Sequence, residues 1–454
     1  MDPSIFKAYD VRGVYGEQLD PDDAYRIGRA FARVLGDEES KAPADLRVGL
    51  GRDMRLTARE MAGRYADGIR DEGADVIDVG MVGTEMLYFA VGSRDLDGGL
   101  MCTASHNPRQ YTGAKLVRRG AIALSGDAGI AEVGRLASGD LGDPADERGN
   151  LSEEDVSEEF RRAAMKFIEP SRVTGRKVVL DGGNGMAGQM VGPLLDQLPI
   201  EQVAMYWEPN GEFPDHEPNP LLPENRTFIV KKVLSEGAEL GIAWDGDADR
   251  CFFIDDTGRF VDGDFLTALL AQSILAKEPG AKILYDVRAS RAVRDVVEAA
   301  GGTALMNRVG HAFFKVRMRE EDAAFGGEVS GHYYFRDFYC ADSGTIPALL
   351  ILELLSQKGQ RMSELLAGFR SKYFISGEIN SEVADQDAKM REIQEHYSDG
   401  EVSHLDGVSV DYPDWHFNVR ASNTEPLLRL NLESLVSPEH MEEKRDEVLG
   451  LIRG

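Results

Sequence analysis

One pattern occurs three times along this chain and restricts its fold more than any other feature. A short apolar strand is followed by a turn, an amphipathic helix, a glycine and a second apolar strand. The first strands of the three copies are expected at residues 46–51, 176–181 and 281–286. Strand, helix and strand at this spacing predict parallel strands joined by a right-handed crossover. The sequence therefore predicts three similar mixed α/β domains in series.

The helices of the three copies are expected at 57–71, 186–198 and 289–300. The C-terminal part differs, because the alternating segments 375–383, 415–420 and 427–433 precede a single predicted helix at 438–453. This order is typical of a smaller antiparallel α+β domain. An acidic, glycine-rich stretch at 138–155 is the clearest linker candidate. The predicted domains are 1–148, 149–252, 253–370 and 371–454.

Composition excludes several classes of protein. A length of 454 residues with 42% hydrophobic residues fits several domains with ample cores. The formal charge of −28 argues against nucleic acid or an anionic membrane as a partner, since such binders present a basic face. Three cysteines without C-x-x-C spacing support neither a disulfide framework nor a zinc site, and fit a reducing cytoplasm. A monomer or a homodimer is expected.

The sequence also predicts a protein that is neither secreted nor membrane-spanning. The N-terminus, M-D-P-S-I-F-K-A-Y-D, has no apolar segment of the kind that a secretory signal needs. The longest apolar run, around 346–355, is interrupted by Glu353 and is too short to cross a bilayer.

The motif D-G-D-A-D-R at 245–250 predicts a divalent metal site. Asp245, Asp247 and Asp249 alternate through a turn after an apolar strand. Carboxylates this close repel one another unless a cation lies among them, and oxygen ligands favour Mg²⁺ or Ca²⁺. An EF-hand is the rival, but its loop requires Gly and Glu where this chain has Arg250 and Asp256. A solvated acidic turn is the remaining alternative.

The motif G-N-G-M-A-G at 183–188 has two interpretations. It matches G-x-G-x-x-G between a strand and a helix, and Glu208 follows about twenty residues later, as a dinucleotide-binding fold requires. Taken alone, it favours a dinucleotide-binding oxidoreductase. A tight turn at any strand-to-helix junction would have the same glycines, and this second interpretation is preferred because no other segment indicates a nicotinamide site. The chain has no G-x-x-x-x-G-K-[ST] motif of a P-loop.

Three further polar loops carry candidate binding groups. T-A-S-H-N-P at 103–108 places a hydroxyl, an imidazole and an amide in a row, and a helix start is one interpretation, because Ser and Asn both cap helices. G-E-V-S-G-H at 327–332 offers a carboxylate and a hydroxyl, which are groups that bind sugar hydroxyls. R-A-S-N-T-E-P at 420–426 combines a guanidinium, hydroxyls, an amide and backbone N–H groups, and is suited to an anion.

Y-D-V-R-G at 9–13, D-G-D-A-D-R and the three polar loops follow one another in the order that is typical of the α-D-phosphohexomutase family. The chain resembles this family, specifically its phosphomannomutase/phosphoglucomutase group. The resemblance spans nearly the whole length. It implies an α/β fold of three similar domains and a smaller C-terminal α+β domain around a central cleft, which agrees with the repeated pattern. It also implies that the glycines at 183–188 form an ordinary turn.

The resemblance implies a reversible movement of phosphate between O6 and O1 of a hexose. Ser105 matches the family's phosphoserine, and a hexose 1,6-bisphosphate is the implied intermediate and primer. A phosphoserine carries about −1.5 to −2 charges at pH 7. Mg²⁺ bound by Ser105, Asp245, Asp247 and Asp249 would neutralise this charge and stabilise the transfer.

The resemblance also implies roles for residues around the transfer. Lys115 with a lowered pKa is the expected base, and Arg12, His106 and Arg250 are expected beside it. The sugar hydroxyls are expected to contact His311, Glu328 and Ser330. The phosphate that is not being transferred is expected to bind Arg420, Ser422, Asn423 and Thr424.

Two positions predict the sugar. Glucosamine-specific relatives typically have Ser where this chain has Thr103, and Gln where it has Val329. Both positions favour mannose or glucose phosphates, with dual activity expected, over a phosphoglucosamine mutase of the same family. The alternatives from other classes are a dinucleotide-binding oxidoreductase and a sugar-phosphate sensor that binds without catalysis.

Overall fold

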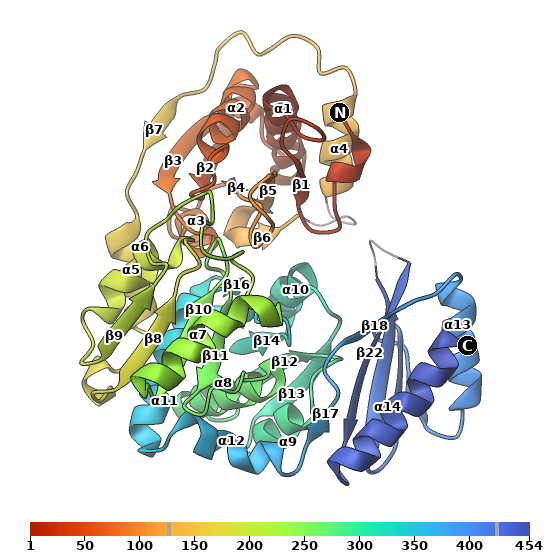
Figure 1. The fold of residues 1–454 in the computed structure, drawn as a ribbon. Coiled ribbons are helices and arrows are strands. Elements are labelled where there is room, and N and C mark those ends of the chain that lie inside the picture. Colours follow the sequence, from red (N-terminus) through yellow and green to blue (C-terminus); the bar gives the residue numbers. More distant parts are fainter. Residues whose placement is uncertain (125–128, 423–425) are drawn as a thin grey trace. The chain divides into compact units, whose positions relative to one another are not determined.

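The structure is a computed structural model that describes residues 1–124, 129–422 and 426–454. The chain divides into two compact units. Unit 1 comprises Met1–Val261 and Gly331–Gly359, and unit 2 comprises Asp262–Ser330 and Gln360–Gly454. Within the described ranges, no helix combines the length and the apolar character needed to span a membrane. Figure 1 shows the helices and strands, coloured along the sequence from red at the N-terminus to blue at the C-terminus.

The first sheet of unit 1 has the order β1-β5-β4-β2-β3-β7, with the two-residue β6 beside β5. β4, β2, β3 and β7 are parallel to one another, whereas β5 is antiparallel to both β4 and β1. The strands are β1 (Val11–Val14), β2 (Arg47–Arg52), β3 (Asp75–Met81), β4 (Gly98–Cys102), β5 (Tyr111–Arg118), β6 (Ile122–Ala123) and β7 (Leu151–Glu153). The helices are α1 (Pro21–Glu39), α2 (Ala58–Asp71), α3 (Thr84–Ser93), α4 (Ile130–Ser138) and α5 (Ser157–Met165).

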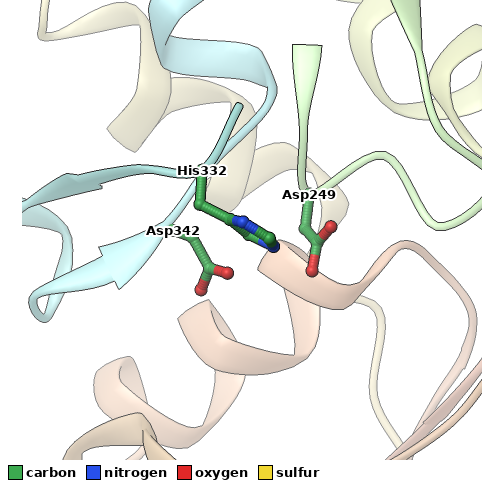
Figure 2. A group of neighbouring side chains, drawn as sticks. All are labelled: Asp249, His332 and Asp342. Carbon is green, nitrogen blue, oxygen red and sulfur yellow. The ribbon is translucent and has the colours of Figure 1, made fainter. Parts of the chain in front are cut away.

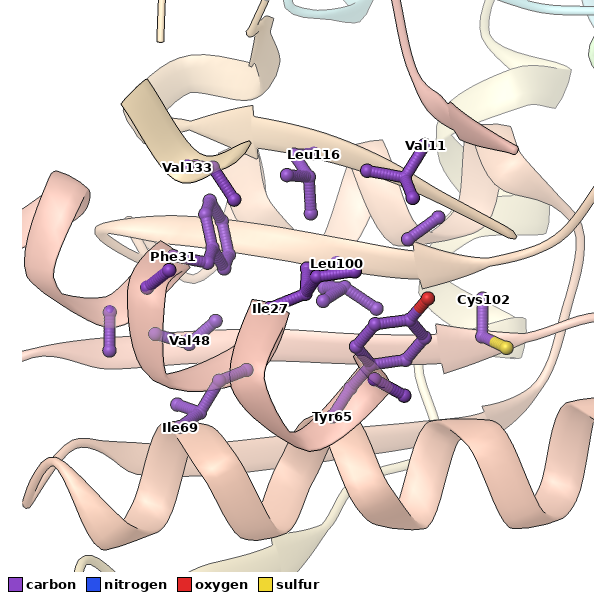
Figure 3. Close-up of a cluster of buried hydrophobic side chains, with 14 of the residues drawn as sticks. Val11, Ile27, Phe31, Val48, Tyr65, Ile69, Leu100, Cys102, Leu116 and Val133 are labelled. Carbon is purple, nitrogen blue, oxygen red and sulfur yellow. The ribbon is translucent and has the colours of Figure 1, made fainter. Parts of the chain in front are cut away.

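The core of this first domain lies between the sheet and the helices α1, α2 and α4 (Figure 3). Phe31 of α1 and Tyr65 of α2 are fully buried there. Two glycines let α1 and α2 approach closely. A Cβ atom on Gly28 would lie 2.3 Å from the carbonyl oxygen of Tyr65, and one on Gly68 would lie 2.0 Å from that of Tyr25. Larger residues at either position would force the two helices apart.

The predicted linker at 138–155 is fastened to the first domain. Arg29 of α1 donates hydrogen bonds to the carbonyl oxygens of Leu141, Gly142 and Asp143 at 3.0–3.2 Å. β7, within the same stretch, pairs with β3. The stretch therefore returns along the sheet and is held there by backbone contacts.

The second sheet has the order β11-β10-β8-β9, in which β10, β8 and β9 are parallel and β11 is antiparallel to β10. Its strands are β8 (Lys177–Asp181), β9 (Glu201–Met205), β10 (Leu240–Trp244) and β11 (Cys251–Asp255), and its helices are α6 (Ala187–Leu195) and α7 (Pro223–Glu236). The second βαβ copy is confirmed. Its helix ends three residues earlier than predicted.

Residues 331–359 form part of unit 1. They form β15 (Tyr333–Phe335), β16 (Ala341–Asp342) and α11 (Thr345–Lys358). Trp244 donates its indole N–H to the carbonyl oxygen of Gly344 at 2.9 Å. Glu353, which interrupts the apolar run of α11, is buried and accepts a hydrogen bond from the backbone N–H of Glu169 at 2.7 Å. The run is thus a buried helix with a partnered carboxylate.

Unit 2 begins with the third copy of the pattern. The parallel strands β13, β12 and β14 lie side by side in that order. The strands are β12 (Lys282–Asp286), β13 (Thr303–Asn307) and β14 (Phe325–Gly327), and the helices are α8 (Gly263–Lys277), α9 (Arg291–Ala299), α10 (His311–Glu321) and α12 (Met362–Arg370).

The C-terminal sheet of unit 2 is antiparallel, with the order β17-β22-β21-β20-β19 and with β18 also paired to β22. Its strands are β17 (Phe374–Ile375), β18 (Ile379–Glu382), β19 (Glu401–Ser403), β20 (Val408–Asp411), β21 (Trp415–Ala421) and β22 (Leu427–Ser434). The predicted helix is present as α14 (Pro438–Arg453), which packs on β22 (Figure 1).

A second helix in this domain, α13 (Gln386–His396), was not predicted. It is largely polar and buries only Ile393 completely among its residues, so it lacks a wide apolar stripe. Its start is nevertheless marked, because the side chain of Asp385 caps the backbone N–H of Ala388 at 2.9 Å. Among the described residues there are also five single-turn 3-10 helices, at Pro3–Ile5, Pro43–Asp45, Arg119–Ala121, Pro170–Arg172 and Arg336–Phe338.

Candidate active site

Ser105 lies in the loop that connects β4 to β5. It is 3% exposed and has a backbone φ of 49°, a left-handed conformation that is uncommon for a residue other than glycine. Its backbone N–H donates to Oγ1 of Thr103 at 2.8 Å. Thr103 in turn donates its hydroxyl to Oδ2 of Asp53 at 2.6 Å. A buried hydrogen-bonded chain therefore fixes the strained serine from its N-terminal side.

The three aspartates lie in the turn between β10 and β11. Asp245 and Asp247 are fully buried, and Asp249 is 1% exposed. One carboxylate oxygen from each lies within 4.8 Å of the other two. A left-handed residue, Ala248 with φ 59°, brings the second and third carboxylates round the turn. Alternation through a tight hairpin thus gathers the three side chains, as the sequence predicted.

The serine loop and the aspartate turn meet. Oγ of Ser105 donates a hydrogen bond to Oδ2 of Asp245 at 3.0 Å, although the two residues are 140 positions apart. The approach depends on Gly246, because a Cβ atom there would lie 2.5 Å from the carbonyl oxygen of Ser105. Unit 1 therefore brings together the predicted nucleophile and the predicted metal ligands.

The aspartate cluster has the properties of a divalent cation site. Among the described residues, Oδ1 of Asp247 and Oδ1 of Asp249 are buried without a hydrogen-bond partner. Burial and the charges of Asp249 and Asp247 together raise the pKa of Asp245 to about 7, against the opposing effect of Arg250. Buried carboxylate oxygens without donors are suited to a hard cation such as Mg²⁺.

Lys115 of β5 brings a cation to the same carboxylates. Its Nζ is 2.6 Å from Oδ2 of Asp247 and also pairs with Asp249. Burial alone lowers the pKa of this ammonium, but the two aspartates outweigh it and hold the pKa well above its usual value. The expectation of a lowered pKa at Lys115 is therefore wrong for this arrangement, since a neighbouring negative charge favours the protonated form.

His106 and Arg250 lie beside Ser105. Nδ1 of His106 is 3.2 Å from Oγ of Ser105 and also contacts Nη2 of Arg250. A guanidinium only donates hydrogen bonds, so this ring nitrogen is the acceptor. Burial lowers the pKa of His106 well below its usual value, and Arg250 adds to the effect. The imidazole is therefore neutral. Arg250 also donates through Nε to Oδ2 of Asp245 at 2.9 Å.

Arg12 of β1 lies next to the serine loop without touching the aspartate triad. Its guanidinium contacts Oδ1 of Asn107 and the carboxylate of Asp10. It is thus tied to the residue two positions after Ser105, and its side chain is 17% exposed.

Sequence reasoning missed three residues around the triad. His332 ends the G-E-V-S-G-H motif, from which only Glu328 and Ser330 were selected. Figure 2 shows its ring with the carboxylates of Asp249 and Asp342 on either side, and ligand atoms of these three lie within 4.8 Å of one another. Burial, with help from Arg250, lowers the pKa of His332 to about 4. Its place in the motif was the available signal.

The other two residues that sequence reasoning missed are Asp342 and Thr84. Thr84 is the first residue of α3. Its hydroxyl contacts Oδ2 of Asp247, and its backbone N–H donates to the carbonyl oxygen of Asp247 at 3.1 Å. No motif marks this threonine in the sequence.

Unit 2 carries the predicted substrate-binding residues. Glu328 is buried and accepts a hydrogen bond from the backbone N–H of Gly310 at 2.9 Å, directly before His311 at the start of α10. Its carboxylate is also 3.7 Å from Arg288, a buried cation that sequence reasoning did not select. Ser330, two residues after Glu328, is half-buried.

The guanidinium of Arg420 lies in a cluster of charged side chains within unit 2. The carboxylate of Glu378 lies 2.7 Å from Arg420, 3.3 Å from Arg429 and 3.6 Å from Arg288. Arg429 also donates to Oγ of Ser422 at 3.3 Å. Arg288 is also paired with Asp286 at 2.8 Å, so the local excess of positive charge comes from Arg420 and Arg429, which share Glu378, and this excess suits a phosphate. The predicted residues Asn423 and Thr424 lie outside the described residues.

The turn at 183–188 leaves no room for a dinucleotide at its glycines. A Cβ atom on Gly188 would lie 1.9 Å from the carbonyl oxygen of Trp207, and one on Gly185 would lie 2.6 Å from that of Gly246. The glycines thus pack against protein backbone, where a dinucleotide fold would place the pyrophosphate. The turn supports the aspartate loop, since Met186 also donates its N–H to Gly246 at 2.9 Å.

Comparison with known proteins gives matches along the whole chain. Models of the phosphoglucomutase/phosphomannomutase family match as alpha/beta/alpha domain I over 3–135, domain II over 158–258, domain III over 262–373 and the C-terminal domain over 378–451. The chain is 43% identical to a phosphomannomutase of Salmonella montevideo over 458 residues, covering 99% of each chain. It is equally identical to phosphohexose mutases of Xanthomonas campestris over 454 residues, again covering 99% of each.

A solved structure gives the same result. The crystal structure of a phosphoglucomutase/phosphomannomutase family protein from Burkholderia thailandensis superimposes with a TM-score of 0.90 at 33% identity. The match covers 100% of this chain and 97% of that one. The chain therefore belongs to the phosphoglucomutase/phosphomannomutase family.

Proposed function

We propose that this protein is a phosphohexomutase that interconverts hexose 6-phosphates and hexose 1-phosphates through a phosphoserine at Ser105. The observation that carries the proposal is the 3.0 Å hydrogen bond from Oγ of Ser105 to Oδ2 of Asp245. It joins the only predicted nucleophile to the predicted metal ligands. The 43% sequence identity over 99% of the chain to proteins called phosphomannomutase and phosphohexose mutases supports the same reaction.

In the proposed reaction, the bond between Oγ of Ser105 and phosphorus breaks as a bond forms from phosphorus to the free sugar hydroxyl. The proton of that hydroxyl leaves and Oγ of Ser105 takes up a proton, so a hexose 1,6-bisphosphate and a free serine hydroxyl result. In the second half, the hydroxyl of Ser105 loses its proton as Oγ bonds to the other phosphorus of this intermediate. The bond from that phosphorus to its sugar oxygen breaks, and the sugar oxygen takes up a proton. The left-handed backbone at Ser105, held by Thr103 and Asp53, presents the hydroxyl for both transfers.

Asp245, Asp247 and Asp249 are the proposed ligands of Mg²⁺. When bound, this ion would neutralise the phosphoserine and stabilise the charge that develops during transfer. Arg250 donates to Asp245 and holds that carboxylate in place. Burial, with help from Arg250, lowers the pKa of His106 and keeps its imidazole neutral. We propose that Lys115 acts as an ammonium that neutralises the transferred phosphate, because Asp247 and Asp249 keep it protonated.

The residues of unit 2 supply the proposed substrate contacts. Glu328, Ser330 and His311 are proposed to bind sugar hydroxyls, and Arg420 and Ser422 to bind the phosphate that is not being transferred. The excess of guanidinium groups around Glu378 supports the second assignment. Asn423 and Thr424 are proposed for the same phosphate from the family resemblance alone.

We propose mannose and glucose phosphates as the substrates. Thr103 and Val329 favour these substrates over glucosamine phosphates. One named relative is called a phosphomannomutase and another is called phosphohexose mutases. A phosphoglucosamine mutase is the second candidate within the family. A monomer or homodimer in the cytoplasm is also proposed, and three buried free cysteines are consistent with a reducing compartment.

A coupled assay tests the proposal. The protein is supplied with Mg²⁺, a trace of glucose 1,6-bisphosphate and, in separate arms, mannose 1-phosphate, glucose 1-phosphate or glucosamine 1-phosphate. Formation of 6-phosphates from the first two supports the assignment. Turnover of glucosamine 1-phosphate alone would replace it by the second candidate. Binding without turnover in every arm would instead indicate a sensor and overturn the proposed reaction.

A further inference from the structure

Arg55 lies in the loop between β2 and α2 and is almost completely buried, with 4% of its surface exposed. None of the family motifs discussed above contains it. Its guanidinium donates hydrogen bonds to three carbonyl oxygens of the loop that carries Ser105 and to that of the first residue of β5. The acceptors and distances are Ser105 at 2.7 Å, Asn107 at 2.6 Å, Pro108 at 2.9 Å and Tyr111 at 3.2 Å.

We propose that Arg55 is a positioning residue for the phosphoryl transfer, which holds Ser105 in its left-handed conformation against Asp245. The carbonyl oxygen of Ser105 lies between Arg55 and Gly246, whose added Cβ would be 2.5 Å from it. The bond from Arg55 therefore fixes the serine where the two loops meet. This inference rests on the proposed function of Ser105.

Asp53 and Phe213 keep the guanidinium in place. The carboxylate of Asp53 accepts a hydrogen bond from the backbone N–H of Arg55 at 2.9 Å, and its Oδ2 is 3.3 Å from Nε of Arg55. The same Oδ2 accepts the hydroxyl of Thr103, which binds the backbone N–H of Ser105. Arg55 and Asp53 thus hold Ser105 from its carbonyl side and its N–H side. The ring of Phe213 covers the guanidinium at 5.2 Å.

A planar guanidinium is needed for this arrangement. Its two terminal nitrogens each bond two of the carbonyl oxygens. A lysine ammonium has three donors on one atom and cannot reach the same four acceptors. A displacement of a reacting group by about 1 Å is enough to reduce a rate by on the order of 10²-fold. Loss of Arg55 should therefore reduce kcat, with little effect on KM, because the proposed sugar and phosphate contacts of unit 2 stay intact.

The experiment compares Arg55→Ala with a matched control, Arg29→Ala. Arg29 is equally buried in the same domain, and its guanidinium also donates to three loop carbonyl oxygens and pairs with Glu72, but its loop carries no proposed catalytic residue. For each full-length variant, kcat, KM, thermal stability and the rate of Ser105 phosphorylation by glucose 1,6-bisphosphate are measured, the last by intact-protein mass spectrometry.

We expect both variants to lose thermal stability. Only in Arg55→Ala should the rate of Ser105 phosphorylation and kcat, each per folded molecule, fall on the order of 10²-fold. The KM of this variant should stay within about threefold of that of the parent protein. If Arg55→Ala does not fold, Arg55→Lys is used, and we expect slower turnover at an unchanged KM. Parental rates for the Arg55 variant that folds, or an equal loss of kcat in Arg29→Ala, would overturn the inference. An inactive, unphosphorylated parent protein would instead overturn the proposed function.

Discussion

Nζ of Lys115 lies 2.6 Å from Oδ2 of Asp247, so a lysine ammonium from the first domain occupies carboxylate oxygens that are the proposed ligands of Mg²⁺. Asp249 accepts the same ammonium. The charge of Lys115 partly compensates three buried carboxylates that would otherwise repel one another. A metal ion at the triad must therefore share or displace this contact.

Replacing Lys115 by methionine should tighten the binding of Mg²⁺ and slow catalysis. Removal of the ammonium leaves Asp247 and Asp249 without their cation, so their affinity for Mg²⁺ should rise. A gain of ~1.4 kcal/mol in binding free energy corresponds to about tenfold in affinity. Thermal unfolding of Lys115→Met and of the parent protein at several Mg²⁺ concentrations measures the affinity. Lys232→Met, which removes a partly buried ion pair with Glu236 away from the aspartates, is the control. Weaker Mg²⁺ binding in Lys115→Met would contradict the prediction.

Replacing Ser105 by alanine should abolish turnover and the attachment of phosphate. The hydroxyl is the proposed phosphate carrier, and the neighbouring hydroxyl of Thr103 is bonded to Asp53. Intact-protein mass spectrometry after incubation with glucose 1,6-bisphosphate should show one phosphate on the parent protein and none on Ser105→Ala. Ser273→Ala, at a buried serine of α8 in unit 2, should keep both phosphate and activity. An active Ser105→Ala protein would refute the phosphoserine mechanism.

Replacing Arg420 by alanine should raise KM for the sugar phosphate by about 10- to 100-fold, with a smaller change in kcat. A hydrogen bond to a charged group contributes about 1.5–3 kcal/mol, and ~1.4 kcal/mol corresponds to tenfold in affinity. Arg291→Ala is the matched control, because its guanidinium also lies within unit 2 but binds Asp411 at 3.0 Å and neighbouring carbonyl oxygens. Steady-state kinetics with mannose 1-phosphate decide the matter, and an equal KM in both variants would count against a phosphate site at Arg420.

The stability of unit 2 should respond to pH through Asp264. Burial raises the pKa of this carboxyl to about 7, and Asp262 adds to the effect. The unfolded value is about 3.9. Because the folded state favours the protonated form, the contribution of Asp264 to stability is present below pH 4 and is lost as the pH rises towards 7.

Asp264→Asn should therefore become progressively more stable than the parent protein between pH 4 and pH 7, by a few kcal/mol at ~1.4 kcal/mol per pKa unit. The amide oxygen can still accept the hydrogen bond from the backbone N–H of Ser290, which is 2.7 Å long in the parent protein. Chemical unfolding at both pH values gives the difference. Asp414→Asn, at an exposed position, should show no such trend. A constant difference across this range would contradict the prediction.

Much of the fold could be predicted from the sequence. The three βαβ copies are present as β2-α2-β3, β8-α6-β9 and β12-α9-β13, each close to the predicted residues. The apolar period of each element is local information, because it follows from which face of a helix or strand is buried. Helix α13 was missed for the same reason, since its sequence has no comparable stripe. The predicted domain boundaries stay predictions.

The candidate site was predictable only in part. Motifs identified Ser105 and the three aspartates because their residue types and spacing indicate a chemistry. Arg55 and Thr84 were not found, because an arginine or threonine outside a motif has no distinctive pattern. Both reach the site through long-range contacts, from Arg55 to the serine loop and from Thr84 to Asp247.

By itself, the sequence determined the three βαβ copies, the net negative charge and the set of groups available for catalysis. These follow from local apolar periodicity and from side-chain chemistry. Only the tertiary structure decided that Ser105 faces Asp245 and that Lys115 is held as a cation. Hydrogen bonds and pKa values depend on distance and burial, and both are set by the packing of segments more than a hundred residues apart.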